Sequence, residues 1–308
     1  MKRGVLSGLV VVGMLFFTGC SDKSSNKMIS GRVIDHYVKG ATVSSGGVST
    51  TTKAYGEFSI EDTGEPLVAQ GGVDIATGDP FIGKLKAPAG SKVINSLTNE
   101  VQAAVEDKGK SVAEAKKYIK SKFDLPDVDV TAYDAIEGLV KNPNSSTAKK
   151  TLARQAQVQA VLNATAKALQ THADADPKKA FEEASKIILE TINKPEDVEK
   201  PETVEKILEE TAKKVGVKQE VMTTLADKAE DIAEKVVEVV AVIEEAVDKD
   251  ADEFVKTAEA AVKAAEEVAE KPEVTEVDEV IEQAKETIKE TLPPKKIYEE
   301  GPTTGAEG

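Results

Sequence analysis

The chain has few of the residues that most often carry chemistry or cross-link a fold. Among its 308 residues there is no Trp, one Cys and two His, and aromatic residues make up only 4%. A single cysteine excludes an internal disulfide, so stability must come from packing. Cores built from Ala, Val, Ile and Leu pack closely and leave little room for a large aromatic-lined ligand pocket.

Motifs of the common enzyme classes are also missing. The sequence contains no Gly-x-Ser-x-Gly elbow, no P-loop and no Gly-x-Gly-x-x-Gly turn. Its two histidines, His36 and His172, are far apart and fall in different expected domains. A zinc site usually needs three or four ligands that include local pairs. We therefore predict no enzymatic activity, no cofactor, and no catalytic or metal-ligating residue. We interpret His172 as a favourable charge near a helix C-terminus.

The carboxylates are abundant but show no catalytic pattern. Most lie three or four residues from a lysine, which is typical of solvated helix faces. No spacing predicts the two converging carboxylates of a glycosidase cleft. The best calcium candidate is a group of four aspartates, which we interpret as helix caps and solvated side chains because the glycine of an EF-hand loop is missing: Asp124, Asp127, Asp129 and Asp134.

The balance of charge is strongly acidic. Lys and Arg number 40 against 55 Asp and Glu, a formal net charge of −15. Such a chain is repelled by nucleic-acid phosphates and by anionic lipid. We therefore expect no nucleic-acid partner.

The N-terminus has the organisation of a secretion signal. Lys2 and Arg3 precede an apolar run over residues 5–17, which is shorter than the roughly 20 residues needed to span a bilayer. Thr18 and Gly19 then lead to Cys20, the only cysteine. This order of basic start, short apolar stretch and small residues is typical of a secretory signal peptide. With the cysteine included, it resembles the lipobox of bacterial lipoproteins.

The lipoprotein resemblance implies how the chain is anchored. Residues 1–19 would be a signal peptide, Cys20 would carry a thioether-linked lipid and an N-acyl group, and residues 20–27 would be a flexible tether. Two or more acyl chains give stable membrane anchoring. Ser21 rather than aspartate follows the cysteine, which favours the outer membrane, on its periplasmic face or at the cell surface. The alternative is an ordinary secretory signal with a chance cysteine.

Alternating apolar and polar residues predict a small β domain. Residues 29–35, 41–44 and 57–60 alternate as half-buried strands do, with turns at Gly40 and Gly46. The pattern resembles the carboxypeptidase regulatory-like, or transthyretin-like, β-sandwich, whose members are accessory, adhesive or sugar-contacting modules and not catalytic. The matching residues are Gly31, Val33, Asp35, Gly40, Ala41, Val43, Thr51, Thr52, Gly56, Phe58 and Ile60.

The segment after these strands has a resemblance of its own. Residues 69–98 are similar to a stretch that follows such β modules in large bacterial surface and adhesin-type proteins. We expect it to add one or two strands, so that the β-sandwich-like domain with its extension covers residues 28–90.

From about Val93 the apolar period becomes helical. Ser111 with Glu114 forms a capping-box pattern, Thr131 and Asp134 predict a cap for a helix over 132–141, and Pro177 predicts another helix start. We expect a helical domain over 91–193, an Ala/Glu/Lys/Val-rich region of antiparallel helices over 194–292, and a disordered tail over 293–308. The predicted fold class is α+β.

These features favour a non-catalytic cell-envelope lipoprotein with a structural or binding role. Its partners would be the membrane, through lipidated Cys20, and an envelope protein or glycan. Two alternatives stay open: a surface adhesin or subunit of an extracellular assembly, and a carbohydrate-binding accessory protein.

Overall fold

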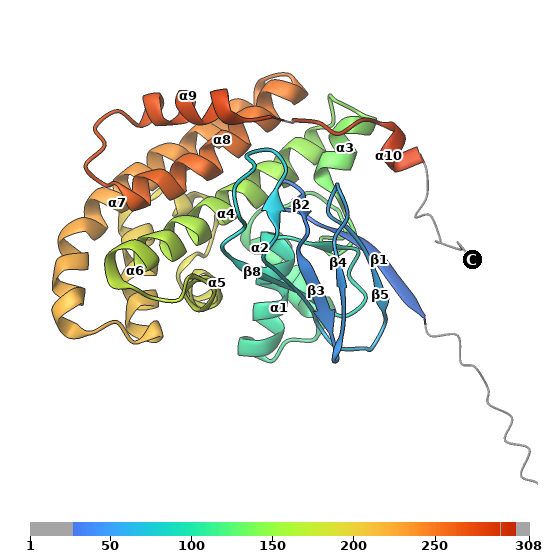
Figure 1. Cartoon of the computed structure of the whole chain (residues 1–308), viewed down its shortest axis with the longest axis horizontal. Helices are drawn as coiled ribbons and strands as arrows, with labels where there is room; N and C mark the ends of the chain where they lie inside the picture. Colours follow the sequence, from blue (N-terminus) through green and yellow to red (C-terminus); the bar gives the residue numbers. More distant parts are fainter. Residues whose placement is uncertain (1–26, 290, 300–308) are drawn as a thin grey trace, which may run out of the picture.

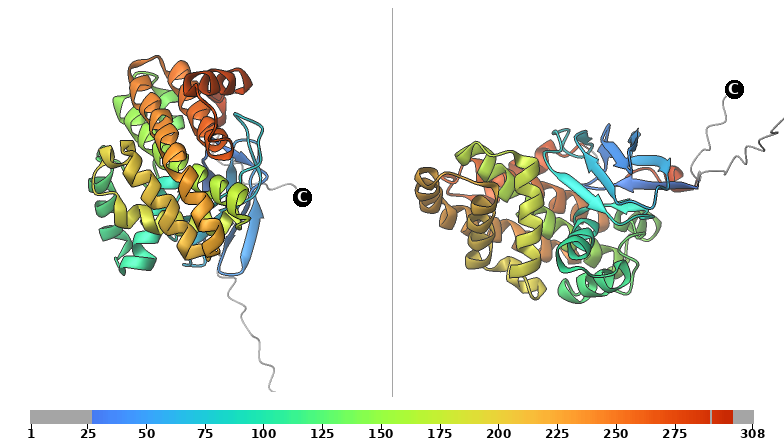
Figure 2. Two further views of the ribbon diagram at one scale, coloured as in Figure 1. Left: turned by 90° about the vertical axis from the view of Figure 1, so that its left-hand side faces the viewer. Right: turned by 90° about the horizontal axis from the view of Figure 1, so that it is seen from below.

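The computed structural model describes residues 27–289 and 291–299. The predicted signal peptide, Cys20 and nearly all of the tether lie outside the described residues. Strands gather at one end of the long axis, and helices α6 (Pro201–Val215) and α7 (Gln219–Glu245) occupy the other end (Figure 1). The view from below keeps this order, with blue and cyan strands at one end and yellow to brown helices at the other (Figure 2).

The strands of the described residues form three small sheets. In the first, β1 (Met28–Val33) pairs antiparallel with β5 (Glu57–Glu61) and parallel with β9 (Val93–Ile94). The second has the order β4-β3-β6-β8, and the third pairs β2 with β7. The remaining bounds are β2 (Val38–Lys39), β3 (Thr42–Ser45), β4 (Val48–Thr51), β6 (Leu67–Gln70), β7 (Val73–Asp74) and β8 (Lys84–Ala87).

The alternation of apolar and polar residues in the sequence explains how the strands bury one face, as β5 shows. In β5, Phe58 and Ile60 are buried while Ser59 between them is exposed, as expected for side chains that point to opposite faces. Gly31 in β1 is required by packing, since a Cβ there would lie 2.2 Å from the carbonyl oxygen of Lys92. Gly56 has a φ of +70° in the turn before β5, a conformation that glycine adopts without strain.

Helix α4 (Ser146–Ala173) is the longest helix of the described residues and packs along α8 (Ala251–Glu270). Both bury alanines, for example Ala160 and Ala261 at 0% exposure, and small side chains let helices approach closely. None of the described helices is long and apolar enough to cross a membrane. The other helices are α1 (Ser96–Lys108), α2 (Val112–Lys122), α3 (Ala135–Lys141), α5 (Pro177–Thr191), α9 (Val277–Thr287) and α10 (Lys296–Glu299), with 3-10 turns η1 (Pro195–Glu199) and η2 (Ala246–Asp248).

Helix capping follows the sequence with one exception. The Ser111–Glu114 capping box at α2 is confirmed, and Pro177 stands in the first turn of α5. The helix predicted over 132–141 starts later, at Ala135, with Asp134 alone as its cap. Asp129 is the reason, because its backbone oxygen accepts the N–H groups of residues 132 and 133 and holds them in a turn.

The α+β fold class is confirmed. The strands and the helices are in contact with one another on both sides of residue 90, the predicted end of the β domain. Strand β9 follows that point and completes the sheet of β1. The side chain of Asn99 in α1 accepts the backbone N–H of Lys86 in β8 at 2.9 Å. Buried residues from both parts belong to one hydrophobic core.

The prediction of a disordered tail from residue 293 is wrong for residues 293–299. Helix α10 lies back on the strand end of the molecule. The guanidinium carbon of Arg32 in β1 lies 4.7 Å from the centre of the Tyr298 ring, and the Thr291 carbonyl oxygen lies 2.6 Å from Nε2 of His36. These long-range contacts outweigh the polar composition of the segment.

Candidate functional site

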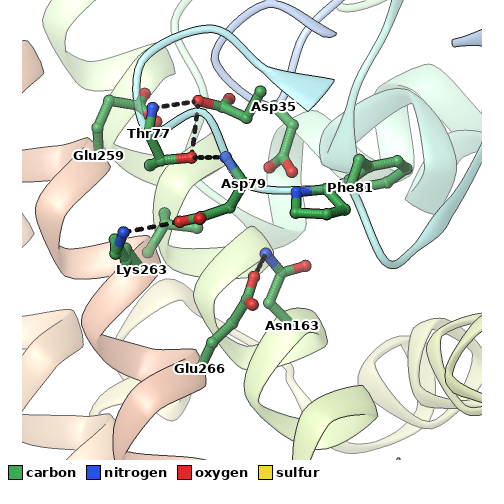
Figure 3. A pocket seen from close by; sticks show the side chains of 11 residues that line it. Asp35, Thr77, Asp79, Phe81, Asn163, Glu259, Lys263 and Glu266 are labelled. Atoms are coloured by element: carbon green, nitrogen blue, oxygen red, sulfur yellow. Dashed lines mark hydrogen bonds and ion pairs between the residues drawn. The ribbon is translucent and has the colours of Figure 1, made fainter. Parts of the chain in front are cut away.

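A hollow between the strands and helix α8 is lined by five carboxyl side chains. It has a volume of about 30 Å³. Figure 3 shows the side chains around it, which come from the loop after β1, the loop after β7, and helices α4 and α8. We call the five acidic residues the carboxyl cluster: Asp35, Asp74, Asp79, Glu259 and Glu266.

Asp74 organises the loop after β7. Its Oδ1 accepts the backbone N–H of Thr77 at 2.9 Å and the Thr77 hydroxyl at 3.3 Å, while its Oδ2 accepts the backbone N–H of His36 at 3.0 Å. The Thr77 hydroxyl oxygen in turn accepts the N–H of Asp79 at 3.0 Å. This is the turn chemistry expected of Asp and Thr side chains that bond to nearby backbone groups.

Helix α8 supplies the opposite wall. Glu259, Lys263 and Glu266 are four and three residues apart, so they fall on one helix face. Lys263 forms an ion pair with Asp79 at 2.7 Å. The side-chain amide of Asn163 in α4 donates to Glu266 at 2.7 Å, so the three helix and loop segments are linked through polar contacts.

Burial raises the pKa values of four members of the cluster. The pKa of Asp35 is raised well above its usual value by burial and then by the charges of Asp74 and Glu266. The pKa of Glu259 is raised by burial and by Asp74 and Asp35. Burial raises the pKa of Asp74 to about 7 against the lowering effect of the donors from Thr77 and Ala76. Burial likewise raises the pKa of Glu266 to about 7, against the lowering effect of Lys167.

The hydrogen bonds indicate where the protons lie. Asp74 accepts three hydrogen bonds, which favour its ionised form. Oδ1 of Asp35 is buried without a partner, and Glu259 is only 5% exposed. Because a buried unpaired carboxylate is costly, we infer that Asp35 is a protonated member of the cluster at neutral pH.

The size of the hollow limits its chemistry. A water molecule needs roughly 10–15 Å³ of such space, so about 30 Å³ admits one or two water molecules and excludes a sugar ring. Glycoside hydrolysis needs its two carboxyls on either side of a bound substrate. Within residues 27–289 and 291–299, no group of three His, Cys, Asp or Glu side chains has a geometry that could hold a metal ion.

The carboxyl cluster was not predicted from the sequence. The prediction that the carboxylates lie on solvated helix faces is wrong for Glu259 and for Glu100 in α1, which is 0% exposed. A local signal existed, since Glu259 is surrounded by Ala258, Ala260 and Ala261 and therefore falls among buried residues. Lysines at positions 256 and 263 gave the opposite indication, because they lie three and four residues from Glu259, a spacing typical of an exposed ion-paired face.

The two histidines occupy separate places. His36 is fully buried at the strand end, and burial lowers its pKa to about 4. His172 lies in the last turn of α4, as predicted, with Nε2 3.0 Å from the carbonyl oxygen of Ala269. The described structure shows no contact between them.

The four aspartates of the calcium candidate do not gather at one point. Asp124, Asp127 and Asp129 each pair with a different lysine, at 2.6, 2.5 and 2.7 Å. Asp134 caps α3 and is otherwise bonded to Tyr37. Capping and ion pairing therefore account for these residues where the structure describes them.

Cys20, the one residue to which the sequence assigns a modification, lies outside the described residues. No family model matches the chain, and neither a curated protein nor a solved structure shows significant similarity to it.

Proposed function

We propose that this protein is a non-catalytic lipoprotein of the bacterial cell envelope, anchored through Cys20, with a structural or binding role. The signal-like residues 1–19 and the single cysteine that follows them support the anchor. The acidic net charge of −15 gives no attraction to anionic lipid, so the acyl chains would supply the membrane affinity.

The position of β1 carries the proposal, because this strand starts only eight residues after Cys20. Strand β1 starts at Met28, whose side chain is exposed, at the strand end of the molecule. Residues 21–27 can span at most about 25 Å. An anchor at Cys20 would therefore hold the sheets near the membrane and direct α6 and α7 away from it.

The two larger sheets support an accessory module of the carboxypeptidase regulatory-like kind. Val33, Val43 and Phe58, which carry the resemblance, are at most 3% exposed. Gly40 and Gly56 have positive φ angles at turns. We propose that β1, β5 and β9 face β3, β4, β6 and β8 as a sandwich-like unit, which in that family serves binding or attachment.

Two features argue against competing functions. The hollow of about 30 Å³ is too small for a substrate larger than a few atoms. Every Phe and Tyr of the described residues is buried or half-buried, so the described surface has no exposed aromatic platform for stacking a sugar. A structural or protein-binding role is therefore better supported than carbohydrate binding.

Membrane fractionation of cells that express the wild-type protein and Cys20→Ala tests the proposal. We expect the wild type in the membrane fraction and the variant in a soluble envelope fraction, since the variant keeps the apolar signal but has no acceptor for lipid. Ser21→Ala is the matched control and should fractionate like the wild type. Equal distribution of wild type and Cys20→Ala would contradict the anchor.

A further inference from the structure

The carboxyl cluster lies where four distant parts of the chain meet. Asp35 follows β1, Asp74 and Asp79 flank the loop after β7, and Glu259 and Glu266 belong to α8. The C-terminal segment crosses beside them, because the N–H of Lys289 donates to the carbonyl oxygen of Ala76 at 2.8 Å. A change of charge in the hollow therefore changes the interaction between the strand loops and α8.

The charges around the hollow are unbalanced. If every carboxyl were ionised, five negative charges would surround a space of about 30 Å³, and Lys263 already pairs with Asp79. Like charges held this close in a buried site repel strongly. Eight charged or titratable groups face the site. They are Asp35 from the loop after β1, Asp74 from the end of β7, Asp79 from the loop after β7, Glu259, Lys263 and Glu266 from α8, Lys167 from α4, which acts on Glu266, and Lys289 beside Gly78.

Few direct contacts between the loop after β7 and α8 resist this repulsion. The ion pair Lys263–Asp79 is the hydrogen-bonded link between them in the described structure, and the Asp79 side chain is 54% exposed. Exposed ion pairs stabilise weakly. We propose that the carboxyl cluster is a pH-operated contact, which holds residues 74–81 against α8 in mildly acidic solution and loosens above neutral pH.

The direction follows from proton linkage. A carboxyl whose pKa is raised in the closed state binds its proton more tightly there than in the open state. Closure is therefore fully favoured below the ordinary carboxyl pKa of about 4 and weakens as pH rises through the raised pKa. For Asp74 and Glu266 that raised pKa is about 7, so the loss of contact falls between mildly acidic and mildly alkaline solution.

Hydrogen–deuterium exchange of the full chain tests this directly. The N–H groups of Asp74, Thr77 and Gly78 are hydrogen-bonded within the loop. Their protection factor, which is the exchange rate of an unfolded peptide divided by the observed rate at the same pH, should fall roughly tenfold or more between about pH 5 and about pH 8. Peptides from α6, far from the cluster, provide the internal reference and should change less.

Two neutral variants connect the effect to the cluster. Glu266→Gln keeps the shape of the side chain and removes a carboxyl whose pKa is raised to about 7, so protection of residues 74–81 at about pH 8 should rise toward its value at about pH 5. Glu267→Gln, on the same helix and paired with Lys271, should keep the wild-type pH dependence. Glu259→Gln provides a second test if Glu266→Gln does not fold.

Three outcomes would overturn the proposal. One is equal protection of residues 74–81 at both pH values in the wild type. Another is wild-type pH dependence retained by both Glu266→Gln and Glu259→Gln. The third is full restoration of protection at about pH 8 by excess CaCl₂, because it would show that a divalent cation rather than protons closes the contact.

Discussion

The hydroxyl of Tyr37 lies 2.6 Å from the carboxylate of Asp134 and 2.6 Å from the hydroxyl of Tyr298. Three parts of the chain meet in this network: the loop after β1, the N-terminus of α3 and helix α10. Arg32 adds a cation–π contact with the Tyr298 ring. The C-terminal segment is therefore fixed to the strand end of the molecule, beside the C-terminal end of β1.

Tyr298→Phe should loosen this segment without unfolding the protein. The variant loses one hydrogen bond but keeps the ring that packs against Arg32, so we expect a loss of about 1 kcal/mol in the free energy of unfolding. Urea denaturation measures the loss, and limited proteolysis should cleave the variant faster near its C-terminus. Lys296→Ala, at an exposed position of α10, should match the wild type; equal cleavage of Tyr298→Phe and wild type would contradict the network.

Asp134→Ala should be more damaging, because Asp134 has two structural roles. It accepts the N–H of Glu137 at the start of α3 and the hydroxyl of Tyr37. Loss of a helix cap costs about 1 kcal/mol, and a buried hydroxyl left without its acceptor costs about 1–3 kcal/mol.

Ser111→Ala is the matched comparison, since it removes a cap of α2 whose hydrogen bonds are exposed. We expect it to cost only about 1 kcal/mol by chemical denaturation. Equal losses in the two variants would show that the Tyr37 contact contributes nothing.

Glu100 should make stability fall with rising pH. It is fully buried in α1, and burial raises its pKa to about 8. The folded state therefore holds the proton more tightly than the unfolded state, and the stabilisation is lost as pH rises from about 4.5 to about 8. The difference in the free energy of unfolding between Glu100→Gln and wild type, measured by urea denaturation, should shift in favour of the variant as pH rises from about 5 to about 8. A difference that does not change with pH would refute this assignment.

Gly31→Ala should disrupt the first sheet. A Cβ at this position would lie 2.2 Å from the backbone oxygen of Lys92, which is bonded to Arg32 N–H, so β1 and the segment before β9 would have to separate. We expect a loss of about 3 kcal/mol or more in thermal or urea unfolding. Gly90→Ala is the control, because its φ is +77° but the space around it is open, and it should cost about 1 kcal/mol. Similar losses in both variants would place the cause in backbone conformation rather than in strand packing.

Local features of the sequence were sufficient to predict local structure. The capping box at Ser111, the proline at the start of α5 and the alternation around Phe58 each depend on residues within a few positions. The α+β class followed from the change of period near Val93. Such patterns are short-range because they reflect backbone hydrogen bonds and the two faces of one element.

The carboxyl cluster could not be predicted in the same way. Asp35 and Glu259 are more than 200 residues apart in sequence, and they share a hollow only because α8 packs beside α4 and the loop after β7. The same holds for Tyr37 and Tyr298. Composition made residues 293–299 look disordered, whereas contacts with Arg32 and Tyr37 hold Tyr298 in place.

We propose that Cys20 carries the lipid that anchors this protein to the cell envelope. Mass spectrometry of the mature protein, isolated from membranes, tests it most directly. We expect an N-terminal peptide that begins at Cys20 and has the added mass of a diacylglyceryl group and an acyl chain. A mature protein that begins at another residue, or at Cys20 without lipid, would contradict it.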